Sequence, residues 1–284
     1  MSSSSKPNIQ QLFQSAHEEG TISAKSLQTL ENLDLGVQIQ SGLGVTVNSV
    51  KASEVILLSM LVDDSGSIRF SGNAQTVRSG HNFVLDSLLA SKQSGNVLVH
   101  TSYLNGHILY PFLPLSIIDE NERKQSGKIV YMPNPLVEKM TGANYNPNLG
   151  TPLYDQTVVM LGRVLAKYQE FADGGVMART ITMLVTDGAD QHSSRSNAAS
   201  VRTLVKDLAG EHHIVAGMGI DDGGNTDFRQ IFRDMGIIDE WILTPGASAA
   251  EIRRAFQVFS QSAIRASQSA AQFTKQAVGG LFVN

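Results

Sequence analysis

The sequence lacks cysteine, and it holds one tryptophan among its 284 residues. Without cysteine the chain can form no disulfide, no thiolate nucleophile and no cysteine-ligated zinc or iron site. Its chemistry must therefore use oxygen and imidazole groups. Basic clusters are also missing, because the formal net charge is −4 and no group of lysine and arginine residues with interleaved aromatic residues occurs. Binding to a phosphate backbone needs such a positive surface, so we do not expect nucleic acid as the main partner.

Long apolar runs are absent as well. No stretch of about 18 apolar residues, the length that spans a bilayer, occurs in the chain. The polar start, residues 1–7, is followed by no apolar segment of the kind that a secretory signal contains. We therefore expect a cytoplasmic protein that does not interact with membranes.

Hydrophobic residues make up 42% of the chain, which is enough to bury a large core. From residue 55 onward, short apolar runs alternate with stretches of helical periodicity. The runs predict strands over residues 55–62, 96–104, 107–113, 180–186, 213–220 and 240–243, and the periodic stretches predict helices over residues 75–92, 151–171, 197–209, 226–235 and 249–272. This alternation predicts an α/β fold, with a mainly parallel central sheet and helices on both of its faces.

Three other segments surround or interrupt the alternation. Helical spacing predicts two helices over residues 8–17 and 23–33, and glycines among alternating apolar residues predict a hairpin over residues 37–50. We therefore divide the chain into a helical and hairpin extension (1–50), an α/β domain (51–270) and a C-terminal tail (271–284). Residues 114–149 fit neither pattern. We expect a long excursion there, with one short strand and one short helix, that forms part of the surface near the functional site.

Oxygen-bearing side chains gather at the predicted ends of two strands and at the start of one helix. The stretch VDDSGS places Asp63, Ser65 and Ser67 directly after the most apolar strand. GTPLYD places Thr151 at a helix start, and VTDG places Asp187 after a second apolar strand. Ligands of open α/β sheets bind at the carboxyl ends of the strands. A set of carboxylates and hydroxyls suits hard divalent cations, so we expect Mg²⁺ or Mn²⁺ at this position.

The order of these motifs, D-x-S-x-S, then a Gly-Thr turn, then T-D-G, resembles the metal-ion-dependent adhesion site of von Willebrand factor A domains, and GTPLYD is similar to the form in bacterial members. The resemblance covers roughly residues 52–265 and implies a Rossmann-like fold. It implies that Ser65 and Ser67 ligate the cation directly and that Thr151 does so conditionally. Asp63 and Asp187 would act through water, and an acidic side chain of a protein partner would fill the remaining coordination position.

For most of the other polar residues near the motifs, the sequence predicts structural or surface roles. Asp64 should point away from its two neighbours, and we expect it to face solvent or cap a helix. The seven histidines show none of the spacings of a metal site, so structural or surface roles are expected for them. His192 lies five residues past Asp187, near enough to the proposed site to meet a partner.

Several enzyme classes share fragments of this pattern without completing it. D-S-G-S resembles the catalytic box of pepsin-like proteases, which need a second box so that two carboxylates share a proton. V-D-D-S-G resembles the aspartate segment of subtilisin-like proteases, but their His-Gly box and Gly-Thr-Ser segment are missing. Haloacid dehalogenase phosphatases need an acid where Ser65 stands, and no P-loop motif occurs.

We therefore expect a non-enzymatic, divalent-cation-dependent protein-binding module, intracellular and of bacterial type. Two alternatives stay open at this point. One is a scaffold subunit that works with an AAA+ ATPase, as chelatase-associated or MoxR-associated von Willebrand A proteins do, with the N-terminal helices and the tail docking its neighbours. The other is a hydrolase that uses Asp64.

Overall fold

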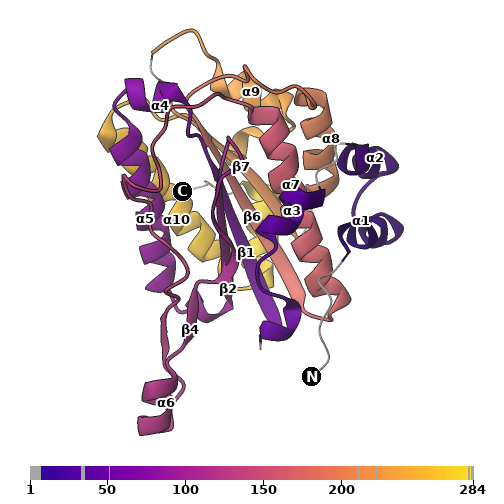
Figure 1. The fold of residues 1–284 in the computed structure, drawn as a ribbon, viewed down its shortest axis with the longest axis vertical. Helices are drawn as coiled ribbons and strands as arrows, with labels where there is room; N and C mark the ends of the chain where they lie inside the picture. The colour runs from indigo at the N-terminus through magenta and orange to yellow at the C-terminus, as the bar shows by residue number, and fades with distance from the viewer. Residues whose placement is uncertain are drawn as a thin grey trace.

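A six-stranded sheet forms the centre of the computed structural model, which describes residues 8–32, 36–50, 52–209, 212–221, 223–280 and 282. Its strands are β1 (Glu54–Val62), β2 (Val97–Tyr103), β3 (Ile108–Pro114), β6 (Met177–Thr186), β7 (His213–Gly219) and β8 (Ile242–Leu243). They lie in the order β3-β2-β1-β6-β7-β8 (Figure 1), and all neighbours pair in parallel except β2 and β3. The predicted α/β class with a mainly parallel sheet is confirmed.

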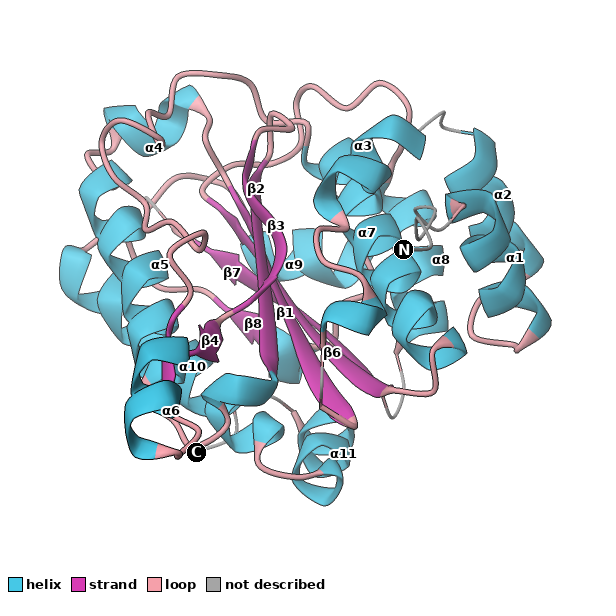
Figure 2. Ribbon diagram, turned by 60° about the horizontal axis from the view of Figure 1, so that its bottom comes forward, coloured by secondary structure: helices cyan, strands magenta, loops and turns pink. Residues whose placement is uncertain are grey.

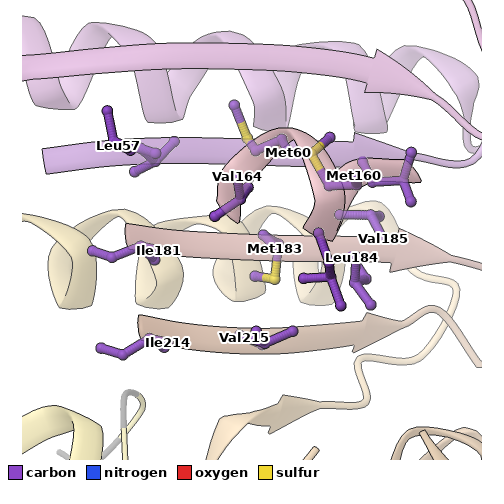
Figure 3. Packing of buried hydrophobic residues seen from close by; sticks show 14 of the residues in the cluster. Leu57, Met60, Met160, Val164, Ile181, Met183, Leu184, Val185, Ile214 and Val215 are labelled. Carbon is purple, nitrogen blue, oxygen red and sulfur yellow. The ribbon is translucent and has the colours of Figure 1, made fainter. Parts of the chain in front are cut away.

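Helices cover both faces of the sheet, which explains why the central strands are apolar along their length. β1 is buried from Val55 to Val62, and β6 is buried from Ala178 onward. α5 (Ala74–Leu89) and α10 (Ala249–Ser267) lie on one side, and α7 (Leu153–Asp173) and α8 (Ala198–Leu208) lie on the other (Figure 2). Met160 and Val164 of α7 lie among side chains of β1 and β6 (Figure 3). Sheets buried on both faces carry such continuous apolar strands.

The predicted last helix, 249–272, is two helices in the structure. α10 ends at Ser267, and α11 (Ala270–Gly279) begins after Ser269, whose hydroxyl accepts a hydrogen bond from the N–H of Gln272. Phe273 of α11 is buried, and the Arg179 guanidinium lies 5.6 Å from the centre of its ring. The part of the predicted tail over residues 271–279 is therefore helical and packed, whereas residues 281, 283 and 284 lie outside the described residues.

The N-terminal helices agree with prediction, and the hairpin does not. α1 (Ile9–Glu18) and α2 (Ala24–Asn32) occupy the predicted ranges, although residues 1–7 and 33 lie outside the described residues. In place of the hairpin over 37–50, the chain forms α3 (Gly36–Gly42) and a 3₁₀ turn, η1 (Val47–Ser49). Gly162 of α7 permits α3 to pack closely, because a Cβ added there would lie 2.8 Å from Ile39 Cδ1. Tertiary contact with α7 thus overrides the local pattern.

Residues 114–149 form the predicted excursion, with two short strands in place of one. β4 (Ser116–Ile118) and β5 (Tyr131–Pro133) pair antiparallel, and α6 (Glu120–Ser126) lies between them. α6 projects at the end of the molecule opposite to α4 (Gly66–Phe70), as Figure 1 shows. The expectation that the excursion forms part of the surface near the site holds for its last residues, since the N–H groups of Asn148 and Leu149 donate to the carbonyl of Asp64, and not for α6.

The remaining elements are short. They are α9 (Phe228–Asp234), η2 (Ser94–Asn96) and η3 (Asp239–Trp241), and η3 replaces the first half of the predicted strand over 240–243. Over the described ranges, no helix combines the length and the apolarity needed to cross a membrane.

Candidate metal centre

The parallel strands β1 and β6 bring the five predicted site residues to one edge of the sheet. Asp63 directly follows β1 and Asp187 directly follows β6, and these strands are neighbours in register, with Val62 opposite Val185. Ser65 precedes α4 and Ser67 lies within it, while Thr151 lies two residues before α7. The five residues come from three separate segments of the chain. They stand at the carboxyl ends of the strands, as predicted.

The hydroxyl groups converge with Asp187. Ser65 Oγ and Ser67 Oγ lie 2.8 Å apart, and Ser67 Oγ donates a hydrogen bond of 2.6 Å to Asp187 Oδ1. Thr151 reaches the same place, because a Cβ added to Gly188 would lie 3.8 Å from Thr151 Oγ1 and 4.0 Å from Ser67 Oγ. Ser65, Thr151 and Asp187 are buried, whereas Ser67 is exposed. The cluster therefore has a buried floor and an opening to solvent at Ser67.

Asp63 forms the deepest part of this floor. Its side chain is 0% exposed; Oδ1 accepts a hydrogen bond from the Ser65 N–H at 2.8 Å, and Oδ2 accepts one from Thr186 Oγ1 at 2.6 Å. Burial raises the pKa of the Asp63 carboxyl, against the opposing effect of these hydrogen bonds. Among the described residues it forms no ion pair with lysine, arginine or histidine. A buried carboxylate without a counter-charge is unfavourable, and a bound cation would compensate it.

The cluster fits a hard divalent cation. It offers two carboxylates and three hydroxyls, and oxygen is the ligand atom that Mg²⁺ and Mn²⁺ prefer. In the part of the chain that the structure describes, no group of three or more histidine, cysteine, aspartate or glutamate residues could hold a metal ion. Hydroxyl oxygens must therefore contribute to any cation site here. The residues and their surroundings suit Mg²⁺ or Mn²⁺, and their role as ligands stays a prediction.

Asp64 has different surroundings from those predicted. Instead of facing solvent or capping a helix, it is 6% exposed. Its Oδ1 accepts hydrogen bonds from the N–H of Asn105 at 3.1 Å and from Asn105 Nδ2 at 2.8 Å. Asn105 Nδ2 also donates to the carbonyl of Gly150 at 2.8 Å, next to Thr151. Burial raises the pKa of the Asp64 carboxyl, and the hydrogen bonds from Asn105 oppose that shift. Asp64 and Asn105 thus link the end of β1 to the loop that carries Thr151.

Sequence reasoning missed two supporting residues. Asn105 stands in the turn between β2 and β3, where Gly106 has a φ of +86°, and Asn-Gly is a common signal of a tight turn. Tyr145 is buried, and its hydroxyl donates a hydrogen bond to the carbonyl of Asp63. An Asn-Gly turn carries no sign of a long-range contact. A tyrosine in the polar stretch GANYNPN gives only weak grounds for expecting one.

His192 lies beside the predicted ligand Thr151, in agreement with its predicted position near the site. Its Nδ1 accepts a hydrogen bond of 2.8 Å from the N–H of Thr151, and the N–H of Gln191 donates to the Thr151 carbonyl at 3.1 Å. A Cβ added to Gly150 would lie 2.9 Å from the His192 ring, so only glycine permits this packing. The imidazole is exposed on its other side. It therefore fixes the backbone of Thr151 at the solvent-exposed edge of the cluster.

The loop after β6 and the start of α7 hold each other in place. Asp190 Oδ1 accepts a hydrogen bond from the N–H of Tyr154 at 3.2 Å, in the first turn of α7. In return, the Asp155 carboxylate accepts hydrogen bonds from the N–H groups of Ser194 at 2.9 Å and Ser196 at 2.6 Å. Acceptors near a helix N-terminus satisfy N–H groups that lack partners within the helix. Hydrogen bonds in both directions therefore connect the segments that carry Thr151 and Asp187.

Solved structures resemble this fold at low sequence identity. The pilus adhesin SpaC from Lactobacillus rhamnosus GG is 12% identical with a TM-score of 0.51, over 76% of this chain and 31% of that chain. A von Willebrand factor type A structure from Catenulispora acidiphila is 16% identical with a TM-score of 0.47, over 75% and 43%. Manganese-loaded TRAP protein from Plasmodium vivax is 19% identical with a TM-score of 0.41, over 72% and 74%. No protein-family model and no curated protein matches the sequence.

Of these three, SpaC has the highest TM-score, and what it shares with this chain is an α/β fold with helices packed on a central sheet. At these identities the similarity concerns the fold alone, and the chain spans only about a third of the length of SpaC. Adhesion by SpaC and the manganese of the TRAP structure are properties of those proteins. The function of this chain has to be argued from its own residues.

Proposed function

We propose that this chain is a divalent-cation-dependent protein-binding module and that it is not an enzyme. Ser65, Ser67 and Thr151 would hold Mg²⁺ or Mn²⁺ through their hydroxyls, with Asp63 and Asp187 orienting the bound water. An Asp or Glu of a protein partner would complete the coordination. The cation would supply the positive charge that draws and holds this carboxylate.

One observation supports the proposal above the others. Five oxygen-bearing side chains from three segments meet at one sheet edge, and the deepest, Asp63, is a fully buried acid that pairs with no positive charge among the described residues. The opening at Ser67 leaves the cluster accessible from solvent. Because few protein charges would face the ion, a carboxylate from outside would gain a strong charge-assisted contact.

The alternatives gain less support from the residues that they need. A hydrolase would need Asp64 exposed to substrate, but its carboxylate is buried and accepts two hydrogen bonds from Asn105. A scaffold bound to an AAA+ ATPase would dock through its terminal elements. One face of each is already covered, because α1 and α3 pack against α7 and α11 packs against α10.

Metal binding is tested first by titrating the metal-free protein with Mg²⁺ and with Mn²⁺ in a calorimeter. We expect a single site in the wild type and at least about tenfold weaker binding in Thr151→Ala and Ser65→Ala, because each loses one oxygen ligand. Thr203→Ala is the matched control, since Thr203 is half-buried on α8 and, among the described residues, its hydroxyl donates a hydrogen bond to the Ala199 carbonyl alone. Equal affinities in all four proteins would refute the ligand set.

The bridging role is tested by co-purification from the native host, in Mg²⁺ and in EDTA. We expect a partner that is retained in Mg²⁺, released by EDTA and not retained by Thr151→Ala. A partner that survives EDTA and the substitution would show that the metal-bridged mechanism is wrong. A stoichiometric ATPase retained under all conditions would favour the scaffold function.

A further inference from the structure

A large aromatic side chain stands exposed at the mouth of the candidate metal centre. Phe70 is the last residue of α4, and 81% of it is exposed. Its ring lies over the backbone of Gly66, because a Cβ added to Gly66 would lie 3.3 Å from Phe70 Cε2. Gly66 stands between Ser65 and Ser67, the two hydroxyls that lie 2.8 Å apart. The exposed ring therefore packs on the residue that lies between the proposed ligands Ser65 and Ser67.

A second exposed apolar side chain flanks the same glycine. Leu149 is 54% exposed, and its carbonyl accepts a hydrogen bond of 3.0 Å from the N–H of Gly66. A parallel bridge also joins Ser65 to Leu149. Single exposed apolar residues are common on protein surfaces, whereas apolar residues gathered beside a polar site indicate a contact surface. We call Phe70 and Leu149 the apolar rim.

The charge at the rim matches an acidic partner. The Arg69 guanidinium lies 5.1 Å from the centre of the Phe70 ring, so a positive charge stands beside the exposed ring. A cation in the centre would add further positive charge. Segments that bring an acid together with an apolar side chain complement this rim, and basic segments do not.

We infer that the partner segment carries an apolar side chain within about two positions of its metal-binding Asp or Glu, and that this side chain packs on Phe70 and Leu149. The inference rests on the proposed function, because the carboxylate has to reach the cation for the neighbouring side chain to reach the rim. It adds a specificity that the cation alone does not supply. A bare carboxylate satisfies the cation alone, whereas the apolar rim also requires an exposed apolar side chain beside the acid.

The probe for this inference is a displayed library of short peptides with a fixed central aspartate and randomised neighbours, selected on the full chain in excess Mg²⁺. Parallel selections use the double variant Phe70→Ser with Leu149→Ser, and Val278→Ser as the matched control, since Val278 is 78% exposed on α11. We expect the wild type and Val278→Ser to select an apolar residue near the aspartate. The selected peptides should bind the double variant about tenfold more weakly or worse, while its Mg²⁺ affinity stays at the wild-type value.

Three outcomes would overturn the inference: no binder from the library in Mg²⁺, no apolar preference on the wild type, or the same preference on the double variant. Failure of the proposed function gives a different result. Selected peptides would then bind equally well in EDTA, or with asparagine in place of the fixed aspartate, whatever their dependence on the rim.

Discussion

The two adjacent buried acids Asp63 and Asp64 have different roles because their side chains contact different groups. Both side chains are less than a tenth exposed, and burial raises the pKa of both carboxyls. Asp63 faces hydroxyl groups and the candidate cation position, whereas Asp64 faces the amide of Asn105. The alternation of side chains at the end of a strand separates the two carboxylates. One acid is placed to compensate a cation, and the other is placed to hold a loop.

Asn105→Ala tests the loop-holding role. The change removes the donor to Asp64 Oδ1 and to the Gly150 carbonyl, which are both partly buried. We expect a loss of about 1–3 kcal/mol in the free energy of unfolding, because the Gly150 carbonyl loses this donor and Asp64 Oδ1 keeps one of its two donors from Asn105. Mg²⁺ should also bind more weakly, since the loop before Thr151 loses its attachment. Urea unfolding in EDTA and calorimetric titration measure the two effects.

The control for that change is Asn121→Ala on the exposed helix α6, where the side chain forms no hydrogen bond among those described. If Asn105→Ala matched Asn121→Ala in both stability and Mg²⁺ affinity, the link between Asp64 and Thr151 would have no energetic role.

The sequence identified the polar residues of the candidate centre better than the residues that position them. Asp63, Ser65 and Asp187 follow strands that are recognisable as apolar runs, so their convergence could be predicted from topology alone. Asn105 and Tyr145 could not be predicted in the same way. Their contacts join positions far apart in the chain, and each residue type has an ordinary local explanation as part of a turn or loop.

Among the elements, the buried strands were predictable and the segments that depend on tertiary contact were not. β1 and β6 are apolar because helices cover both faces of the sheet, and that burial is visible in composition. α3 was predicted as a hairpin because its glycines resemble turn residues. Gly42 in fact allows close approach, since a Cβ there would lie 2.5 Å from Arg163 Cδ. Whether such glycines form a turn or allow close helix packing depends on residues that are distant in the chain.

The contact between β2 and α7 places a histidine beside a buried arginine. His100 Nδ1 lies 2.8 Å from the Tyr110 carbonyl, and Arg163 Nη1 lies 3.5 Å from His100 Nε2 and 3.0 Å from Ser102 Oγ. Burial, and then the charge of Arg163, lower the pKa of His100 to about 3. Protonation of His100 in the folded protein would place two positive charges together in the core.

His100→Gln should therefore make the protein less sensitive to acid. The unfolded histidine has a pKa near 6.5, so below that pH the unfolded chain binds the proton that the folded chain refuses, and stability falls as the pH falls toward about 3. Between pH 7 and pH 5 this one group contributes a loss of about 2 kcal/mol, which glutamine would remove. Urea unfolding across this range measures the slope. His107→Gln, at an exposed position, is the control, and parallel slopes for wild type and His100→Gln would contradict the assignment.

At the scale of the whole molecule, α7 joins the N-terminal segment to the sheet. One of its sides packs on β1 and β6, and another contacts α1 and α3. Lys167 Nζ donates hydrogen bonds of 2.6 Å to the Val45 carbonyl and to Glu170 Oε2, while Glu170 Oε1 accepts one of 3.1 Å from the N–H of Val47. The two charged side chains are 1% and 7% exposed. The buried ion pair of α7 thus holds backbone groups of Val45 and Val47, which lie on the other side of the predicted boundary at residue 50.

Glu170→Ala tests how firmly the N-terminal segment is held. The substitution leaves the Lys167 ammonium buried without its counter-charge and frees the N–H of Val47, so we expect a loss of about 3–5 kcal/mol in the free energy of unfolding. Asp86→Ala is the matched control, because the Lys139–Asp86 pair is 52% and 53% exposed and such pairs contribute at most about 1 kcal/mol. Urea unfolding measures both, and proteolysis near residues 45–47 would locate the released segment. Equal losses in the two variants would mean that solvent reaches the Lys167–Glu170 pair and that the N-terminal segment is held by apolar packing alone.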